Sequence, residues 1–124
     1  MKALSIQQPW ADRILSGVKT REYRSWSTSY RGLILVHAGK VINKEAWDGD
    51  PPETALIRGA ILGVVEVIGM EGRRPACAWV LRNPWRLPAP VPCRGQLGLF
   101  DLDPNCIPGL DRIIHLPVSI GDRP

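Results

Sequence analysis

The chain contains few of the residues that usually hold metal ions or form redox centres. Among its 124 residues are three cysteines and two histidines. Cys77, Cys93 and Cys106 are widely spaced, no C-x-x-C pair occurs, and the histidines stand alone, so a zinc site is not expected. We therefore predict reduced thiols, no metal ion and no cofactor.

The chain also lacks an apolar run long enough to span a bilayer, and its first residues do not resemble a leader peptide. The sequence therefore predicts a soluble, cytoplasmic protein with no membrane partner. A length of 124 residues suits one domain with a real core. Twelve prolines and twelve glycines favour short strands and many turns over a helical bundle.

The net charge of +4 is modest and unevenly distributed. Fourteen of the 16 cations, but only 8 of the 12 carboxylates, lie in residues 1–100. Twelve of the cations are arginines, whose planar guanidinium suits phosphates and stacks on bases. This balance favours a nucleic acid or nucleotide as the partner, although solubility alone explains it equally well.

The pattern of apolar residues indicates many short elements. Strands are predicted for residues 3–6, 19–26, 33–36, 60–70, 78–81, 94–100 and 113–118. A helix is predicted from Gln8-Pro9 to Gly17, and shorter helical segments at 43–47 and 53–58. The prolines of residues 82–88 predict an irregular exit from the sheet. The fold class is α+β: a small, partly open β-barrel with two or three short flanking helices.

Residues 19–26 gather three cations, a carboxylate and two aromatic rings in one predicted strand. The two-residue period places Glu22 and Arg24 on one face, which suggests an ion pair at the lip of a groove. Lys19 follows the helix stop directly and can lie in a turn, outside this alternation. Polar side chains also occur in residues 5–11 before this strand and in residues 31–38 after it. Together the three segments predict the wall of a polar cleft. A solvated edge strand is the alternative.

Glu66 interrupts the most apolar strand, and a buried carboxylate needs a partner or a raised pKa. Lys19, Arg24 and His37 are the candidate partners, and we favour a structural ion pair over a proton-transfer group. His37 ends a buried strand and is interpreted as structural rather than as a pocket residue. Trp85, between two arginines, either stacks on a base or clamps one end of the barrel.

Six blocks occur in a characteristic order: S-I-Q-Q-P-W-A, G-V-K-T-R-E-Y-R-S-W, R-G-L-I-L-V-H-A, G-V-V-E-V, A-W-V-L-R-N-P and R-G-Q-L-G-L-F. With them the chain resembles the ASCH domain, the activating signal cointegrator 1 homology domain of the PUA-like superfamily, from about Leu4 to Leu102. Tyr23 stands where the family normally has Asn, and Phe100 where a Trp is common. We predict an ASCH domain over residues 1–102 and a C-terminal extension over 103–124.

The resemblance implies a PUA-like pseudobarrel with a cleft between the first helix and the barrel. The ligand would be RNA, another single-stranded nucleic acid or a modified nucleoside. Carried over to this sequence, the ligand-binding residues would be Ser5, Gln8, Trp10, Lys19, Thr20, Glu22, Arg24, Trp26, His37 and Glu66. Their chemistry agrees, because cations bind phosphate, Gln and Glu read base edges, and an exposed indole stacks.

The resemblance also leaves an enzyme open. Small superfamily members that hydrolyse N4-acetylcytidine use a lysine matching Lys19, a threonine three residues later and a downstream glutamate. Glu22 occupies the threonine position, so that hydroxyl is missing; in an enzyme, Lys19 and Glu22 would be the catalytic pair. A ribonuclease would need Lys19 beside a hydroxyl such as that of Ser5, Ser25 or Tyr23. A protein-interaction module is the third class, and would use the surface of Trp85 and the tail.

Overall fold

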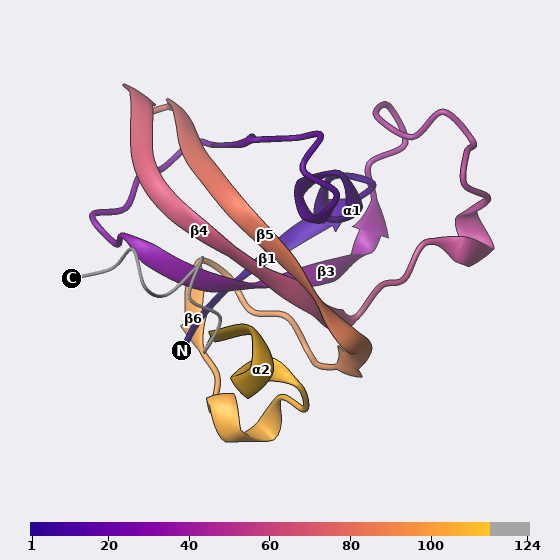
Figure 1. The fold of residues 1–124 in the computed structure, drawn as a ribbon. Helices are drawn as coiled ribbons and strands as arrows, with labels where there is room; N and C mark the ends of the chain where they lie inside the picture. The colour runs from indigo at the N-terminus through magenta and orange to yellow at the C-terminus, as the bar shows by residue number, and fades with distance from the viewer. Residues whose placement is uncertain (115–124) are drawn as a thin grey trace.

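The computed structural model describes residues 1–114, which form one six-stranded mixed sheet with short helices packed against it (Figure 1). The elements are β1 (Lys2–Gln8), α1 (Trp10–Leu15), β2 (Arg21–Arg24), β3 (Gly32–Ile42), η1 (Glu53–Ala55), β4 (Ala60–Arg73), β5 (Ala76–Pro92), β6 (Leu99–Asp101), η2 (Pro104–Cys106) and α2 (Leu110–Ile114). This is the predicted small α+β pseudobarrel. Within residues 1–114, no helix has the length and apolar character needed to cross a bilayer.

The strand order is β2-β5-β4-β3-β1-β6, and only β1 and β3 pair in parallel. Two apolar clusters form because successive side chains of a strand point to opposite faces. In β1, Leu4 and Ile6 join one cluster and Ala3 joins the other. Helix α1 covers the first cluster, and Leu110 and Ile113 of α2 pack into the second. The two helices lie well apart in Figure 1.

Helix α1 is short and has clear boundaries. Pro9 precedes its first residue, and Gly17 has a φ of +85° just beyond its end, as the sequence predicts. At its start, the side-chain oxygen of Gln8 accepts a hydrogen bond from the Asp12 amide (3.0 Å). The chain therefore turns directly from β1 into α1, and from α1 toward β2.

Strands β4 and β5 form a long, bent ribbon. Their register shifts at three places, and Asn83 of β5 has a φ of 54°. Such bulges bend a strand and increase its twist, which curls the sheet. The predicted irregular exit after residue 81 was wrong: β5 continues to Pro92. The prolines are tolerated because β5 pairs with β2 only over residues 77–80, so its later residues have an open edge.

Other predicted elements were too long or of the wrong type. The strand predicted at 19–26 is reduced to β2, and the one at 94–100 to β6, which leaves residues 93–98 as a loop. Residues 43–47 form a turn in which Asn43 Oδ1 accepts from the Ala46 amide. Residues 113 and 114 lie in α2, not in a strand, and the rest of that predicted strand lies outside the described residues.

Glu66 is buried in β4, but its predicted partners were wrong. Its Oε1 accepts hydrogen bonds from Arg82 Nε and Asn83 Nδ2, both at 3.1 Å, rather than contacting Lys19, Arg24 or His37. Both donors lie on β5 beside the register shift between Val64 and Glu66. The carboxylate therefore links β4 to the bulged part of β5.

Candidate functional site

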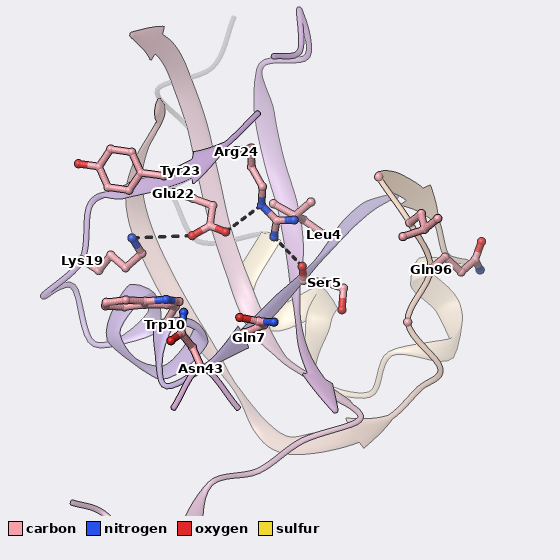
Figure 2. Close-up of a pocket in the computed structure, with 13 residues that line it drawn as sticks. Leu4, Ser5, Gln7, Trp10, Lys19, Glu22, Tyr23, Arg24, Asn43 and Gln96 are labelled. Carbon is pink, nitrogen blue, oxygen red and sulfur yellow. Dashed lines mark hydrogen bonds and ion pairs between the residues drawn. The ribbon is translucent and has the colours of Figure 1, made fainter. Parts of the chain in front are cut away.

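A cleft of about 910 Å³ opens beside α1 and β2 (Figure 2). Strand β1 supplies its floor with Leu4, Ser5 and Gln7. One wall carries the side chains of Trp10, Lys19, Glu22, Tyr23 and Arg24. The other wall consists of residues 95–98, and Asn43 completes the lining. The cleft therefore joins residues 4–24 to a loop more than 70 residues further along the chain.

The polar centre of the cleft is Glu22, which is only 6% exposed. Its Oε2 accepts a hydrogen bond from Arg24 Nε at 2.9 Å, and its Oε1 lies 3.8 Å from Lys19 Nζ. Arg24 Nη2 also donates to the backbone oxygen of Ser5 at 2.6 Å. The predicted pair of Glu22 and Arg24 is present, and Lys19 reaches it from outside the strand. Two cations thus share one carboxylate.

The ammonium group of Lys19 lies between two aromatic rings, as Figure 2 shows. Its Nζ is 4.7 Å from the ring centre of Trp10 and 4.9 Å from that of Tyr23. Both distances are within the range of cation–π attraction. The Arg13 guanidinium lies 5.1 Å from the Trp10 ring. The rings hold the lysine in place, while Tyr23 itself stays 69% exposed.

Burial affects proton binding by both members of the Lys19–Glu22 pair. Loss of solvation raises the pKa of Glu22 more than the nearby Arg24 and Lys19 lower it. Burial likewise lowers the pKa of Lys19, against the opposing effect of Glu22. Each group is thus charged less readily than in water.

The opposite wall is attached to the barrel through His37. Ser5 and His37 are register partners in β1 and β3, and Ser5 Oγ lies 2.9 Å from His37 Nδ1. His37 Nε2 lies 2.7 Å from the backbone oxygen of Cys93. Because that oxygen only accepts, Nε2 carries the proton, and in the neutral ring Nδ1 accepts from Ser5. His37 is buried behind the cleft and connects its floor to the 93–98 loop.

Among residues 1–114 no three histidine, cysteine or acidic side chains come together in a way that would hold a metal ion. The family model of the ASCH domain matches residues 4–83. The chain belongs to the ASCH domain family. This family implies a PUA-like fold of the kind that binds RNA. No curated protein matches the chain.

The structure brings half of the predicted ASCH-domain site residues into the cleft. These are Ser5, Trp10, Lys19, Glu22 and Arg24. They come from β1, α1, the turn before β2 and β2 itself. The G-V-K-T-R-E-Y-R block thus supplies most of one wall of the cleft.

The other half of the predicted residues does not line the cleft. Gln8 is buried, and its Nε2 donates to the Ile57 oxygen. Trp26 packs edge-on against Trp79 with ring centres 4.8 Å apart. Thr20 is exposed, and its backbone oxygen accepts from the Leu81 amide. The remaining two, His37 and Glu66, have the structural partners described above.

The predicted set of site residues omitted several residues that line the cleft. Gln7, Tyr23, Asn43 and the loop residues 95–98 all line the cleft. The two-residue period places Tyr23 on the face opposite Glu22, yet Tyr23 lines the cleft, with its ring centre 4.9 Å from Lys19 Nζ. The two glycines of R-G-Q-L-G indicated a loop and were read as part of a strand. That loop lies beyond the residues that the family model matches.

Proposed function

We propose that this ASCH domain binds single-stranded RNA, or a nucleotide from such a strand, in the cleft beside α1. The observation that carries the proposal is the convergence of Lys19 and Arg24 on a cleft that also holds the rings of Trp10 and Tyr23. Phosphates are bound by lysine and arginine, and unpaired bases stack on aromatic rings. Two cations against one carboxylate leave this wall with a positive charge.

The shape of the cleft supports an unpaired ligand. Its volume of about 910 Å³ is near the upper end of the range for small-molecule pockets. A base within a duplex shows only its edge, whereas the exposed Tyr23 ring requires a free base face. The ligand's phosphate would approach Lys19 and Arg24, where its negative charge compensates for the loss of solvation.

Fluorescence anisotropy with a labelled single-stranded hexanucleotide and with the same sequence as a duplex tests the proposal. We expect binding of the single strand to be tighter. The logarithm of its affinity should fall with the logarithm of salt concentration, with a slope of about −1.4 for two phosphate contacts. Equal binding of the duplex would contradict the proposal, and an affinity independent of salt would indicate an uncharged nucleoside as the ligand.

A hydrolase is the second candidate, and one specific contact favours it. Lys19 Nζ and Glu22 Oε1 lie 3.8 Å apart in the cleft, with the pKa of the lysine lowered and that of the glutamate raised. Such a pair suits proton transfer. Incubation with N4-acetylcytidine and with RNA, followed by chromatography, tests it. Released acetate or shortened RNA, absent in Lys19→Ala, would establish the enzyme; intact substrates would reject it.

A further inference from the structure

The 93–98 loop, which forms the second wall of the cleft, is held in place by contacts from the barrel. His37 bonds the Cys93 oxygen at 2.7 Å, and the Cys93 amide donates to the Gly59 oxygen at 3.0 Å. The loop therefore starts from a fixed point, although none of its residues from 93 to 98 belongs to a strand. Its backbone approaches the β1–β3 floor closely at Gly95.

Gly95 leaves no room for a side chain. A Cβ at this position would lie 2.8 Å from His37 Cε1 and 3.0 Å from Ser5 Oγ. The first distance is shorter than real Cβ contacts, so any larger residue would displace the loop or the histidine. Gly95 thus lets the backbone rest on the Ser5–His37 pair, and this contact sets the width of the cleft.

The tip of the loop presents two chemically different side chains. Leu97 is 98% exposed although it lines the cleft, and Gln96 beside it is also exposed. Figure 2 shows Gln96 on the side opposite Lys19 and Tyr23. An exposed leucine on a fixed loop offers an apolar contact, and a glutamine amide offers one donor pair and one acceptor. Together they match the flat face and the polar edge of a nucleobase.

We propose that Gln96 and Leu97 form the base-specificity wall of the cleft, while Lys19 and Arg24 bind the phosphate. His37 and Gly95 are positioning residues that set the distance of this wall from Tyr23. This inference rests on the proposed binding of single-stranded RNA. It assigns recognition of the base to residues outside the family match, which ends at residue 83. The ligand is then an unpaired nucleotide whose base edge is read by hydrogen bonds.

The base-specificity wall is tested with four homopolymeric RNA hexamers. Their binding is compared between wild type, Gln96→Ala and Leu97→Ser. We expect wild type to prefer one base, and Gln96→Ala to reduce that preference by about fivefold or more, because base-edge hydrogen bonds carry discrimination. Leu97→Ser should weaken binding of all four RNAs. The control is Val41→Ser, which removes an exposed apolar side chain that does not line the cleft.

A second pair of variants tests the positioning role. Gly95→Ala should displace the loop and reduce the base preference, while Gly69→Ala should leave it unchanged. At Gly69 a new Cβ would make only ordinary contact with Val80, at 3.8 Å. Thermal melting of both variants separates loop displacement from unfolding, and the preference is measured only below the melting transition. A Gly95→Ala protein with unchanged preference would overturn the role of the loop.

The outcomes distinguish the inference from the function on which it rests. If wild type binds RNA but Gln96→Ala and Leu97→Ser keep its affinities and base preference, the specificity wall is rejected and the proposed function stands. If wild type binds none of the four RNAs, both the proposed function and the inferred specificity wall are rejected. Loss of preference in Gln96→Ala and Gly95→Ala, with both controls unchanged, supports the inference.

Discussion

Two glutamates are almost equally buried in this protein, and their surroundings differ. Glu22 is 6% exposed and Glu66 is 8% exposed, and each accepts a hydrogen bond from the Nε of an arginine. Glu66 bonds Arg82 and Asn83 at a bulge between β4 and β5. Glu22 bonds Arg24 in a cleft, beside a lysine that lies between two aromatic rings.

The difference lies in what surrounds the cations. The side chain of Arg82 is 51% exposed and can be solvated, so Glu66 mainly fixes the β4–β5 bulge. The side chains of Lys19 and Arg24 are 13% and 24% exposed, and they line a cleft. Burial of opposite charges is expensive and adds little net stability. Three such charges at the wall of a cleft therefore support the proposed binding of a ligand there.

The largest effect is expected from removing each carboxylate. Glu22→Ala should lower the free energy of unfolding by about 2–3 kcal/mol, because it leaves two largely buried cations without their partner. Glu66→Ala should cost about 1 kcal/mol, because water can solvate the half-exposed Arg82. Urea denaturation measures both values. Equal losses of unfolding free energy in the two variants would mean that both glutamates contribute equally to stability and would contradict the comparison.

A smaller effect is expected from removing one cation from each glutamate. Lys19→Ala should weaken RNA binding about tenfold, or about 1.4 kcal/mol, with little change in folding, because Arg24 still pairs with Glu22. Arg82→Ala removes the same charge from Glu66 and should leave RNA affinity unchanged. Anisotropy titrations compare the two variants. A similar loss in both would show that binding depends on overall charge rather than on the cleft.

The smallest effect is the pH dependence of stability, and its sign is specific to Glu22. Because its pKa is raised in the folded protein, the folded state binds this proton more tightly than the unfolded state. The resulting stabilisation is fully present at pH values below the pKa that Glu22 has in the unfolded protein. It is lost as the pH rises through the pKa that Glu22 has in the folded protein. The unfolding free energy of wild type relative to Glu22→Gln should therefore fall as the pH rises from about 4, the ordinary pKa of a glutamate, upward. Urea titrations across this range measure the difference, and a rise would show that pairing outweighs burial.

Much of the fold could be predicted because local patterns determine it. Pro9 and Gly17 bracket α1, and the segment at residues 60–67, apolar apart from Glu66, becomes the buried part of β4. The length of β5 could not be predicted, since its prolines are compatible with a strand only where no neighbour pairs with them. The partners of Glu66 also depend on strand pairing, because a register shift between β4 and β5 brings Arg82 and Asn83 beside it.

The candidate site was predictable where its residues are close in sequence. The spacing of Glu22 and Arg24 indicated their ion pair, and the helix stop indicated that Lys19 lies in a turn. The second wall was not predictable, because it depends on His37 contacting a loop 56 residues further along the chain. Trp26 illustrates the opposite error: its side chain packs against Trp79 in the core instead of facing the cleft. The division into residues 1–102 and 103–124 stays a prediction.

The most direct test of RNA binding in the cleft uses the indole N–H signals of the five tryptophans in an NMR titration with single-stranded RNA. Trp10 lines the cleft, whereas the Trp47 indole donates to the Pro51 oxygen outside it. We predict that the Trp10 signal shifts in proportion to RNA bound, that the Trp47 signal stays in place, and that Lys19→Ala needs about tenfold more RNA to give the same Trp10 shift. A shift of Trp47 with an unchanged Trp10 signal would place the RNA elsewhere and contradict the account.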